Sequence, residues 1–270
     1  MKVTYQGETG AYSEMAVYKF FGRKVEPVPC KDFRDVFESV KTGVVPHGVV
    51  PIENSIEGSV NQNYDLFLAY DLKVCGEVAV KLAHVLIGNP KTKLEDIQTV
   101  YSHPQALAQC RKYLEKHKWE IIPAYDTAGA VKIIKEKGLS NSAAIASEKA
   151  ADLYDMKILA RDIADNPSNY TRFLVLGLED AAPTGDDKTS IIFSAKHAPG
   201  TLYHALGEFA SRNINLTRIE SRPTKTTAWQ YNFYLDFEGH RTEKRCKEAL
   251  EALEKFATFV KILGSYPRVI

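Results

Sequence analysis

The stretch VVPIENSIEGSV, residues 49–60, changes from an apolar run to a polar cluster within a few positions. Val49 and Val50 predict a buried strand, and four hydrogen-bonding side chains follow it: Glu53, Asn54, Ser55 and Glu57. An ordinary loop gains nothing from two carboxylates so close to an apolar strand end. Ligands of open α/β folds bind at the carboxyl ends of strands. The stretch therefore predicts an α/β fold with a binding site where this strand ends.

Strand-like runs alternate with helical patterns on both sides of this stretch, up to about residue 178. The expected strands are Lys2–Gln6, Val25–Pro29, His47–Val50, Gly76–Leu86, Gln98–Tyr101, Glu120–Tyr125, Ser142–Ala146, Lys157–Ala160 and Thr171–Leu178. Strands separated by helices are typical of α/β domains with largely parallel sheets.

Three of the intervening helices have recognisable starts. Asp32 is expected to cap the helix in KDFRDVFESVKTG. Ser102 and Gln105 have the spacing of a capping box at the start of SHPQALAQCRKYLEKH. Asp126 or Thr127 opens the helix in TAGAVKIIKEKG. These starts lie where parallel strands end, so they are also candidate positions for anion-binding N–H groups.

The pattern changes after a linker rich in Pro, Gly and Asp, Glu179–Lys188. The segments expected beyond it are a strand at Lys188–Ala195, a helix at Thr201–Arg212, strands at Asn215–Ser221 and Ala228–Phe237, a helix at Arg241–Phe256 and a strand at Val260–Tyr266. The order βαββαβ is that of a ferredoxin-like α+β module. The sequence thus predicts a small α+β module behind a larger α/β one.

Composition narrows the classes of function. The 270 residues carry a formal net charge of +1, which argues against binding to nucleic acid or to a membrane surface through bulk charge. No apolar run is long enough to span a membrane and the N-terminus lacks the apolar core of a signal peptide, so we expect a cytoplasmic protein. The four cysteines are scattered and the seven histidines do not pair at metal-ligand spacing. We therefore expect neither a disulfide framework nor a metal site.

Three further stretches could carry chemistry. Gln6–Ala16 reads as a strand, a two-glycine loop and a helix start that suits a carboxylate, or alternatively as a simple tight turn. Tyr101–Leu107 sets polar side chains in the first turn of a helix, and Asp165–Gly177 runs from a turn into an apolar strand. On that strand Thr171 and Phe173 share one face, whereas Arg172 points to the other and is expected to brace a neighbouring element. The histidines His47, His84 and His117 are interpreted as surface or satisfied core residues.

Taken in order, the motifs GETGAYSE, PIENSIEGSV, SHPQAL and NYTRFLVLG resemble those of prephenate dehydratases. PGTLYHAL at 199–206 and NLTRIESRP at 215–223 resemble the ACT regulatory domain attached to such enzymes, although Thr201 stands where that motif commonly has Ala. The resemblance covers nearly the whole chain. It implies a two-lobed catalytic domain similar to type II periplasmic binding proteins, at 1–180, followed by an ACT domain at 188–267. Lobe one is expected at about residues 1–80 plus 160–180, and lobe two at about residues 81–159.

The resemblance also implies an activity, a carbon–oxygen lyase reaction that converts prephenate to phenylpyruvate with loss of CO2 and water, without a cofactor. The positions that match the family's motifs imply four catalytic residues: Thr171, Asn54, Gln105 and Ser102. Further expected contacts with substrate are Ser55, Glu57, Gly10, Ala11, Tyr12, His103, Arg172 and Phe173. Feedback inhibition by L-phenylalanine is implied at Gly200, Thr201, Leu202, Asn215, Leu216, Thr217 and Glu220, where two copies of a homodimer or homotetramer meet. The alternatives are an arogenate dehydratase and a non-catalytic amino-acid-sensing protein.

Overall fold

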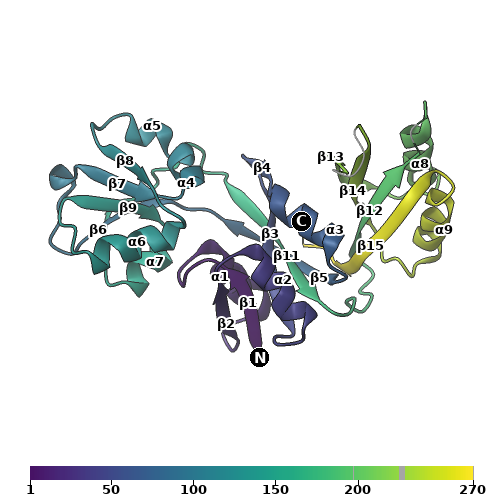
Figure 1. Ribbon diagram of the computed structural model, residues 1–270, viewed down its shortest axis with the longest axis horizontal. Helices are drawn as coiled ribbons and strands as arrows, with labels where there is room; N and C mark the ends of the chain where they lie inside the picture. Colours follow the sequence, from purple (N-terminus) through teal and green to yellow (C-terminus); the bar gives the residue numbers. More distant parts are fainter. Residues whose placement is uncertain (197, 225–228, 270) are drawn as a thin grey trace.

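The computed structural model of the chain describes residues 1–196, 198–224 and 229–269. It contains three bodies, each built around its own sheet. Figure 1 shows them side by side, with the body that carries the N-terminus in the middle. The described chain ends at Val269, whose N–H donates to Glu77 Oε1 of the middle body at 3.0 Å.

The middle body, lobe one, is formed by two stretches that lie far apart in the sequence. Its sheet has the order β2-β1-β3-β11-β5, with β4 paired to β3. The strands are β1 (Lys2–Gln6), β2 (Glu26–Cys30), β3 (His47–Asn54), β4 (Gly58–Ser59), β5 (Lys73–Lys81) and β11 (Tyr170–Gly177), and the helices are α1 (Tyr12–Phe21), α2 (Phe33–Lys41) and α3 (Asn61–Ala69). Strand β11 returns from far along the sequence and lies antiparallel between β3 and β5.

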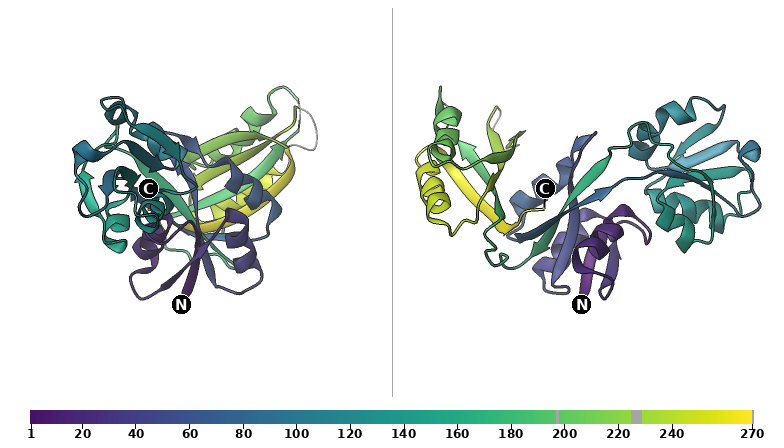
Figure 2. Two further views of the ribbon diagram at one scale, coloured as in Figure 1. Left: turned by 60° about the vertical axis from the view of Figure 1, so that its left-hand side comes forward. Right: turned by 180° about the vertical axis from the view of Figure 1, so that it is seen from behind.

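The second lobe lies entirely between β5 and β11 in the sequence. Its sheet has the order β10-β6-β9-β7-β8. The elements are β6 (Val85–Gly88), a 3-10 helix (Leu94–Asp96), β7 (Thr99–Ser102), α4 (Pro104–Gln109), α5 (Arg111–Leu114), β8 (Glu120–Pro123), α6 (Thr127–Glu136), β9 (Ser142–Ala146), α7 (Glu148–Leu153) and β10 (Lys157–Ala160). The chain passes between the lobes twice, after β5 and before β11. Figure 2 shows both crossings from behind.

The third body has the predicted βαββαβ order. It consists of β12 (Asp187–Ala195), α8 (Thr201–Ala210), β13 (Leu216–Pro223), β14 (Tyr231–Glu238), α9 (Lys244–Leu253) and β15 (Ala257–Pro267). Its antiparallel sheet has the order β13-β14-β12-β15, with β13 at one edge. The predicted fold class, two α/β lobes followed by a ferredoxin-like module, is confirmed.

The third body is packed tightly onto lobe one. The sheet face opposite its helices contributes Ile192, Tyr234 and Tyr266 to one apolar core with Phe67 and other residues of lobe one. Lys261 donates hydrogen bonds to three carbonyl oxygens at the end of α3, those of Phe67, Leu68 and Tyr70. The two bodies therefore share a core.

Several local predictions were wrong. The predicted strand Gly76–Leu86 is two strands, because the chain crosses between lobes after Lys81. Strand β3 extends through Pro51 to Asn54, since β11 pairs with it that far. The helix that begins at Pro104 breaks at Cys110. Asp32 and Asp126 cap their helices as predicted, whereas Ala228 lies outside the described residues.

Candidate active site

Two antiparallel strands bring Asn54 and Thr171 together. Asn54 ends β3, Thr171 lies near the start of β11, and the two residues are directly paired. Their side chains point to the same side of the sheet, because residues opposite one another on paired strands share a face. Both are nearly inaccessible to solvent, at 3% and 8% exposure. Residues separated by more than a hundred positions thus meet at one sheet edge.

The hydrogen bonds of Asn54 fix the orientation of its amide. Its Oδ1 accepts from the backbone N–H groups of Ile56 and Glu57, both at 2.9 Å. Its Nδ2 therefore faces Thr171 and donates to Oγ1 at 3.0 Å, as well as to Asn169 Oδ1 at 2.7 Å. Since the Thr171 oxygen accepts this bond, its own hydrogen is left to point elsewhere. The geometry makes Thr171 a hydrogen-bond donor toward its open side.

A chain of buried polar side chains continues from this pair into lobe two. Asn169 Nδ2 donates to Gln109 Oε1 at 2.9 Å, and the same oxygen lies 2.8 Å from His84 Nε2. Two donors on one amide oxygen imply that His84 carries its proton on Nε2. Burial lowers the pKa of His84, which favours the neutral ring. Its Nδ1 is then an acceptor 3.1 Å from the hydroxyl of Tyr12, whose single hydrogen it shares with the Ala83 carbonyl oxygen at 2.9 Å.

These side chains, apart from that of Asn169, line a small cavity of about 80 Å³ between the lobes. Its lining consists of Tyr12, Asn54, Leu82, His84, His103, Gln105, Ala106, Gln109, Thr127 and Thr171. None of them is Asp, Glu, Lys or Arg. Tyr12 and Thr127 are the first residues of α1 and α6, two ten-residue helices whose starts favour negative charge. The cavity is thus uncharged, rich in donors and suited to an anion.

Five of the predicted site residues meet at this cavity: Asn54, Thr171, Gln105, Tyr12 and His103. Sequence reasoning missed Gln109, Asn169 and Thr127, and His84 is a satisfied buried residue that also lines the cavity. Gln109 lies one helical turn beyond Gln105, a spacing that places both on one face of a helix. That periodicity was the available signal for Gln109.

Other predicted residues support the site without lining it. The side chain of Ser102 is buried and donates to the carbonyl oxygen of Ile145 at 2.6 Å, so it joins β7 to β9. It does not form the predicted capping box, because His103 is the N-cap residue and accepts from the Gln105 N–H. Gly10 adopts φ +92° and donates its N–H to Glu14 Oε2.

Ala11 and Phe173 are core residues and do not line the cavity. Ser55 ties the end of β3 to the second crossing, since its Oγ accepts from the Tyr170 N–H at 2.9 Å. The side chain of Glu57 is exposed, and only its backbone N–H serves Asn54.

Arg172 does not contribute to the cavity. Its side chain points away from Thr171 and binds Glu77 and Asp236, both at 2.7 Å. The prediction that Arg172 contacts substrate conflicts with this placement, because strand alternation sends it to the opposite face of the sheet. Its expected role as a brace is the one the geometry supports.

A larger cavity of about 660 Å³ lies where α1 meets α7, and its lining includes Glu14, Tyr18 and Lys149. That lining contains none of the hydrogen-bonded side chains that connect Asn54 to His84. Glu14 and Lys149 are paired with each other at 2.8 Å across the two lobes. The larger cavity therefore lacks the connected, uncharged polar side chains that line the smaller one.

In the third body the residues predicted to bind L-phenylalanine lie in three different places. Thr201 and Leu202, beside Gly200 at the start of α8, line a cavity of about 160 Å³ together with Tyr231 and Phe233. Asn215, Leu216 and Thr217 lie at the other end of the sheet, where Leu216 pairs with Phe237. Glu220 faces lobe one and is bonded to Ser59 and Arg218, so it is not open to a ligand.

Comparison with known proteins identifies the class to which this fold and site belong. Residues 3–181 match the model of the prephenate dehydratase family and residues 189–255 match that of the ACT domain. A prephenate dehydratase of Methanocaldococcus jannaschii is 46% identical over 98% of this chain and 97% of its own length.

Two solved structures have the same architecture. The prephenate dehydratase of Arthrobacter aurescens, determined in complex with L-Phe, has a TM-score of 0.91 and 33% identity over 99% of this chain and 90% of its own. GqqA, described as a novel type of quorum quenching acylase, has a TM-score of 0.90 and 32% identity over 100% of this chain and 98% of its own. The chain belongs to the prephenate dehydratase family.

Within the residues that the structure describes, no group of three or more His, Cys, Asp or Glu side chains gathers as a metal site. The helices of the described chain include none long and apolar enough to cross a membrane.

Proposed function

We propose that the cavity between the lobes is where the family's reaction, the dehydration and decarboxylation of prephenate to phenylpyruvate, takes place. The carboxylate on the ring leaves as CO2, and the electron pair of the broken C–C bond enters the ring. The ring hydroxyl departs with its own bonding pair and becomes water on taking up a proton. The ring becomes aromatic, which supplies much of the driving force, so the reaction requires no cofactor.

The orientation of the Asn54 amide carries this proposal. Because Asn54 donates to Thr171, the Thr171 hydroxyl is free to donate to the departing hydroxyl of the substrate. A chain of hydrogen bonds polarises its members, so the bond from Asn54 strengthens the one from Thr171. A threonine hydroxyl is too weak an acid to transfer its proton unaided, and we assign it a donor hydrogen bond that stabilises developing negative charge.

The uncharged lining suits a substrate that must lose a carboxylate. Neutral donors such as Gln105 and Gln109 can orient a carboxylate without pairing it with a positive charge. A fully paired ring carboxylate would resist loss of CO2. The second carboxylate of prephenate is assigned to the start of α1, where the helix dipole favours an anion, because the Asp126 carboxylate already caps α6.

Substrate entry requires the lobes to separate. The cavity of about 80 Å³ is much smaller than the roughly 300–1,000 Å³ of ordinary ligand pockets. Contacts between the lobes include Lys149 with Glu14 and the hydrogen bond from Ser147 to the Gly10 carbonyl oxygen at 2.9 Å. We propose that these contacts open by hinge motion at the two crossings and close over substrate.

The substrate is proposed to be prephenate rather than arogenate. Arogenate carries an ammonium group where prephenate has a keto oxygen, and a buried ammonium needs a carboxylate or several acceptors. No Asp or Glu lines the cavity. The test is turnover of both compounds by the purified protein, and kcat/KM is expected to be higher for prephenate. Failure to form phenylpyruvate from prephenate would refute the proposed function.

For the ACT domain, at about 188–267, we propose L-phenylalanine as a feedback inhibitor. Support comes from the Arthrobacter aurescens relative, determined with L-Phe, and from the cavity beside Thr201 and Leu202. Since Asn215–Thr217 lie at the other end of the same sheet, we propose that they complete the site of a second copy in a homodimer or homotetramer. Addition of L-phenylalanine should lower turnover and raise the melting temperature. Unchanged turnover would contradict this.

A further inference from the structure

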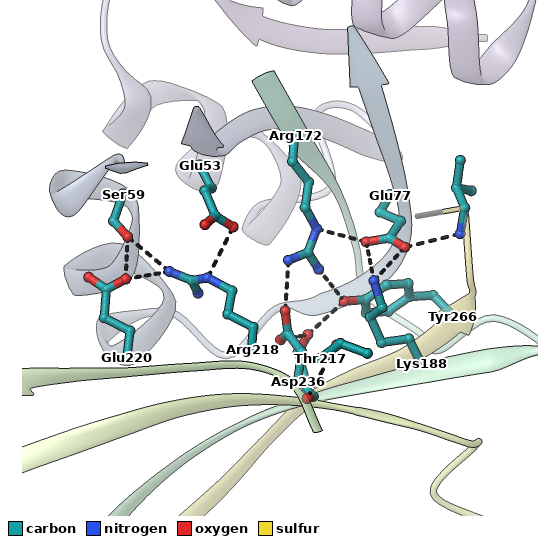
Figure 3. A network of polar contacts seen from close by, with 12 residues as sticks. Glu53, Ser59, Glu77, Arg172, Lys188, Thr217, Arg218, Glu220, Asp236 and Tyr266 are labelled. Carbon is teal, nitrogen blue, oxygen red and sulfur yellow. Dashed lines mark hydrogen bonds and ion pairs between the residues drawn. The ribbon is translucent and has the colours of Figure 1, made fainter. Parts of the chain in front are cut away.

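Two charged residues, Arg172 and Glu53, lie next to Thr171 and Asn54 on the paired strands and on the opposite face of the sheet. On β11 and β3, Thr171 pairs with Asn54 and the next residue, Arg172, pairs with Glu53. Successive strand residues point to opposite faces, so Thr171 and Asn54 face the cavity while Arg172 and Glu53 face the ACT sheet. Figure 3 shows both charged side chains reaching toward that sheet.

Arg172 is held by a buried network that the two domains share. Its guanidinium binds Glu77 of lobe one at 2.7 Å, and from the ACT sheet it binds Asp236 at 2.7 Å and the Tyr266 hydroxyl at 3.1 Å. Lys188 of the ACT sheet binds Glu77 at 2.9 Å. Two cations and two anions are thus buried together, one of each sign from each domain (Figure 3). Arg172 and Glu77, which pair with each other within lobe one, each also pair with a buried charge of the ACT sheet, so buried ion pairs join the two domains.

Asp236 is fixed on both of its oxygens. Oδ2 accepts from Arg172, and Oδ1 accepts from the Ser190 hydroxyl at 2.5 Å. Although burial alone would raise it, the pKa of Asp236 is lowered by Arg172 and by this hydrogen bond. The carboxylate is a rigid, charged anchor for Arg172.

Glu53 has a second anchor on the edge strand β13, although the Glu53 side chain is more exposed, at 38%, than that of Arg172, at 11%. Arg218 Nε lies 3.1 Å from Glu53 Oε2, and Arg218 Nη2 donates to Ser59 Oγ at 2.9 Å. Ser59, on β4, is paired with Glu53, on β3, so Arg218 binds side chains from both strands of this hairpin. The Arg218 guanidinium also lies over the Tyr64 ring, 4.8 Å from its centroid, which fixes its plane.

We propose that Asp236 and Arg218, two residues of the ACT sheet, are positioning residues for the reaction, acting on Thr171 through Arg172 and on Asn54 through Glu53. The inference rests on the proposed function of the cavity. Each anchor acts one residue away from a side chain whose hydrogen-bond direction matters. A misplacement of about 1 Å at a reacting centre can cost roughly a hundredfold in rate.

The chain offers a matched control for Arg218. Arg222 lies on the same strand and face and is similarly buried, with side-chain exposure of 14% against 11%. Its partners across the interface are Asp65, at 3.3 Å, and Asn61, both on α3 rather than on β3. Arg222→Gln therefore removes an arginine from the same interface without touching the strand that carries Asn54.

The experiment measures kcat, KM and melting temperature on prephenate for the full chain and its variants. Arg218→Gln is expected to lower kcat roughly tenfold with KM within about twofold, while Arg222→Gln keeps kcat within about twofold. Glu53→Gln should lower kcat by the same factor as Arg218→Gln. The double variant that carries both substitutions should lose no more kcat than either single variant. Asp236→Asn should lower kcat at least as much as Arg218→Gln. If Asp236→Asn prevents folding because Asp236 is buried, the comparison of Arg218→Gln with Arg222→Gln still decides the test.

Equal kcat values for Arg218→Gln and Arg222→Gln, at comparable melting temperatures, would overturn the inference. So would a double variant whose loss is the product of the two single losses, because independent effects multiply. Wild-type turnover of prephenate separates these results from failure of the proposed function. If the wild-type protein forms phenylpyruvate and the variants do not differ, only the positioning role is refuted.

Discussion

Replacing Thr171 by valine isolates the hydroxyl that the structure aims at the cavity. Valine has nearly the same shape, and the Asn54 amide keeps its bonds to Asn169 Oδ1 at 2.7 Å and to the Tyr170 carbonyl oxygen at 3.2 Å. Loss of one hydrogen bond should therefore cost only about 0.5–1.5 kcal/mol of folding stability. That corresponds to a fall of roughly 1–6 °C in melting temperature.

The effect on turnover should be much larger. One preorganised donor at a developing negative charge is worth about 2.7–4 kcal/mol, so kcat should fall about 10²–10³-fold while KM changes little. The assay follows phenylpyruvate formation at saturating prephenate. Thr171→Ser is the control: it keeps the hydroxyl and loses only the methyl group that restricts its rotamer, so kcat should stay within roughly tenfold. A Thr171→Val protein that retains more than about a tenth of wild-type kcat would refute the role of this hydroxyl.

Three other substitutions test the surroundings of the site and the domain contact. Gln109→Leu should leave the buried donors of His84 and Asn169 without an acceptor, which should lower the free energy of unfolding in urea by about 1–3 kcal/mol for each donor. Gln109→Glu keeps an acceptor, so its free energy of unfolding should be closer to that of the wild type. Because burial lowers the pKa of His84, the unfolded chain binds its proton more readily; the free energy of unfolding should fall as pH drops below about 6.5, and His84→Gln should reduce that fall. A Cβ at Gly264 would overlap the Val74 carbonyl oxygen of lobe one, so Gly264→Ala should lower the melting temperature, while Gly207→Ala, in open space on α8, should leave it unchanged or raise it.

The sequence predicted the architecture well because its signals are local. Capping by Asp32 and Asp126 and the alternation of strands and helices need only neighbouring residues, and both are found in the structure. The pairing of β11 between β3 and β5 depends on long-range contacts that no local pattern contains.

The site was only partly predictable for the same reason. Asn54 and Thr171 were expected to converge, and they do. Asn169 was missed because its amide bonds Gln109 of the other lobe, a relation visible only after folding, whereas the helical spacing of Gln109 from Gln105 could have indicated Gln109. Ser102 was misassigned because its hydroxyl bonds a carbonyl on the neighbouring strand β9, which competes with local helix capping.

The direction of the bond between Asn54 and Thr171 is the central claim, and Asn54→Asp tests it most directly. A carboxylate has nearly the same shape as the amide but only accepts, so the Thr171 hydroxyl would turn its hydrogen away from the cavity. We predict that kcat for prephenate falls about 10²–10³-fold in Asn54→Asp and that adding Thr171→Val costs almost nothing more. A near wild-type kcat for Asn54→Asp, or a double variant in which the two losses multiply, would contradict the claim.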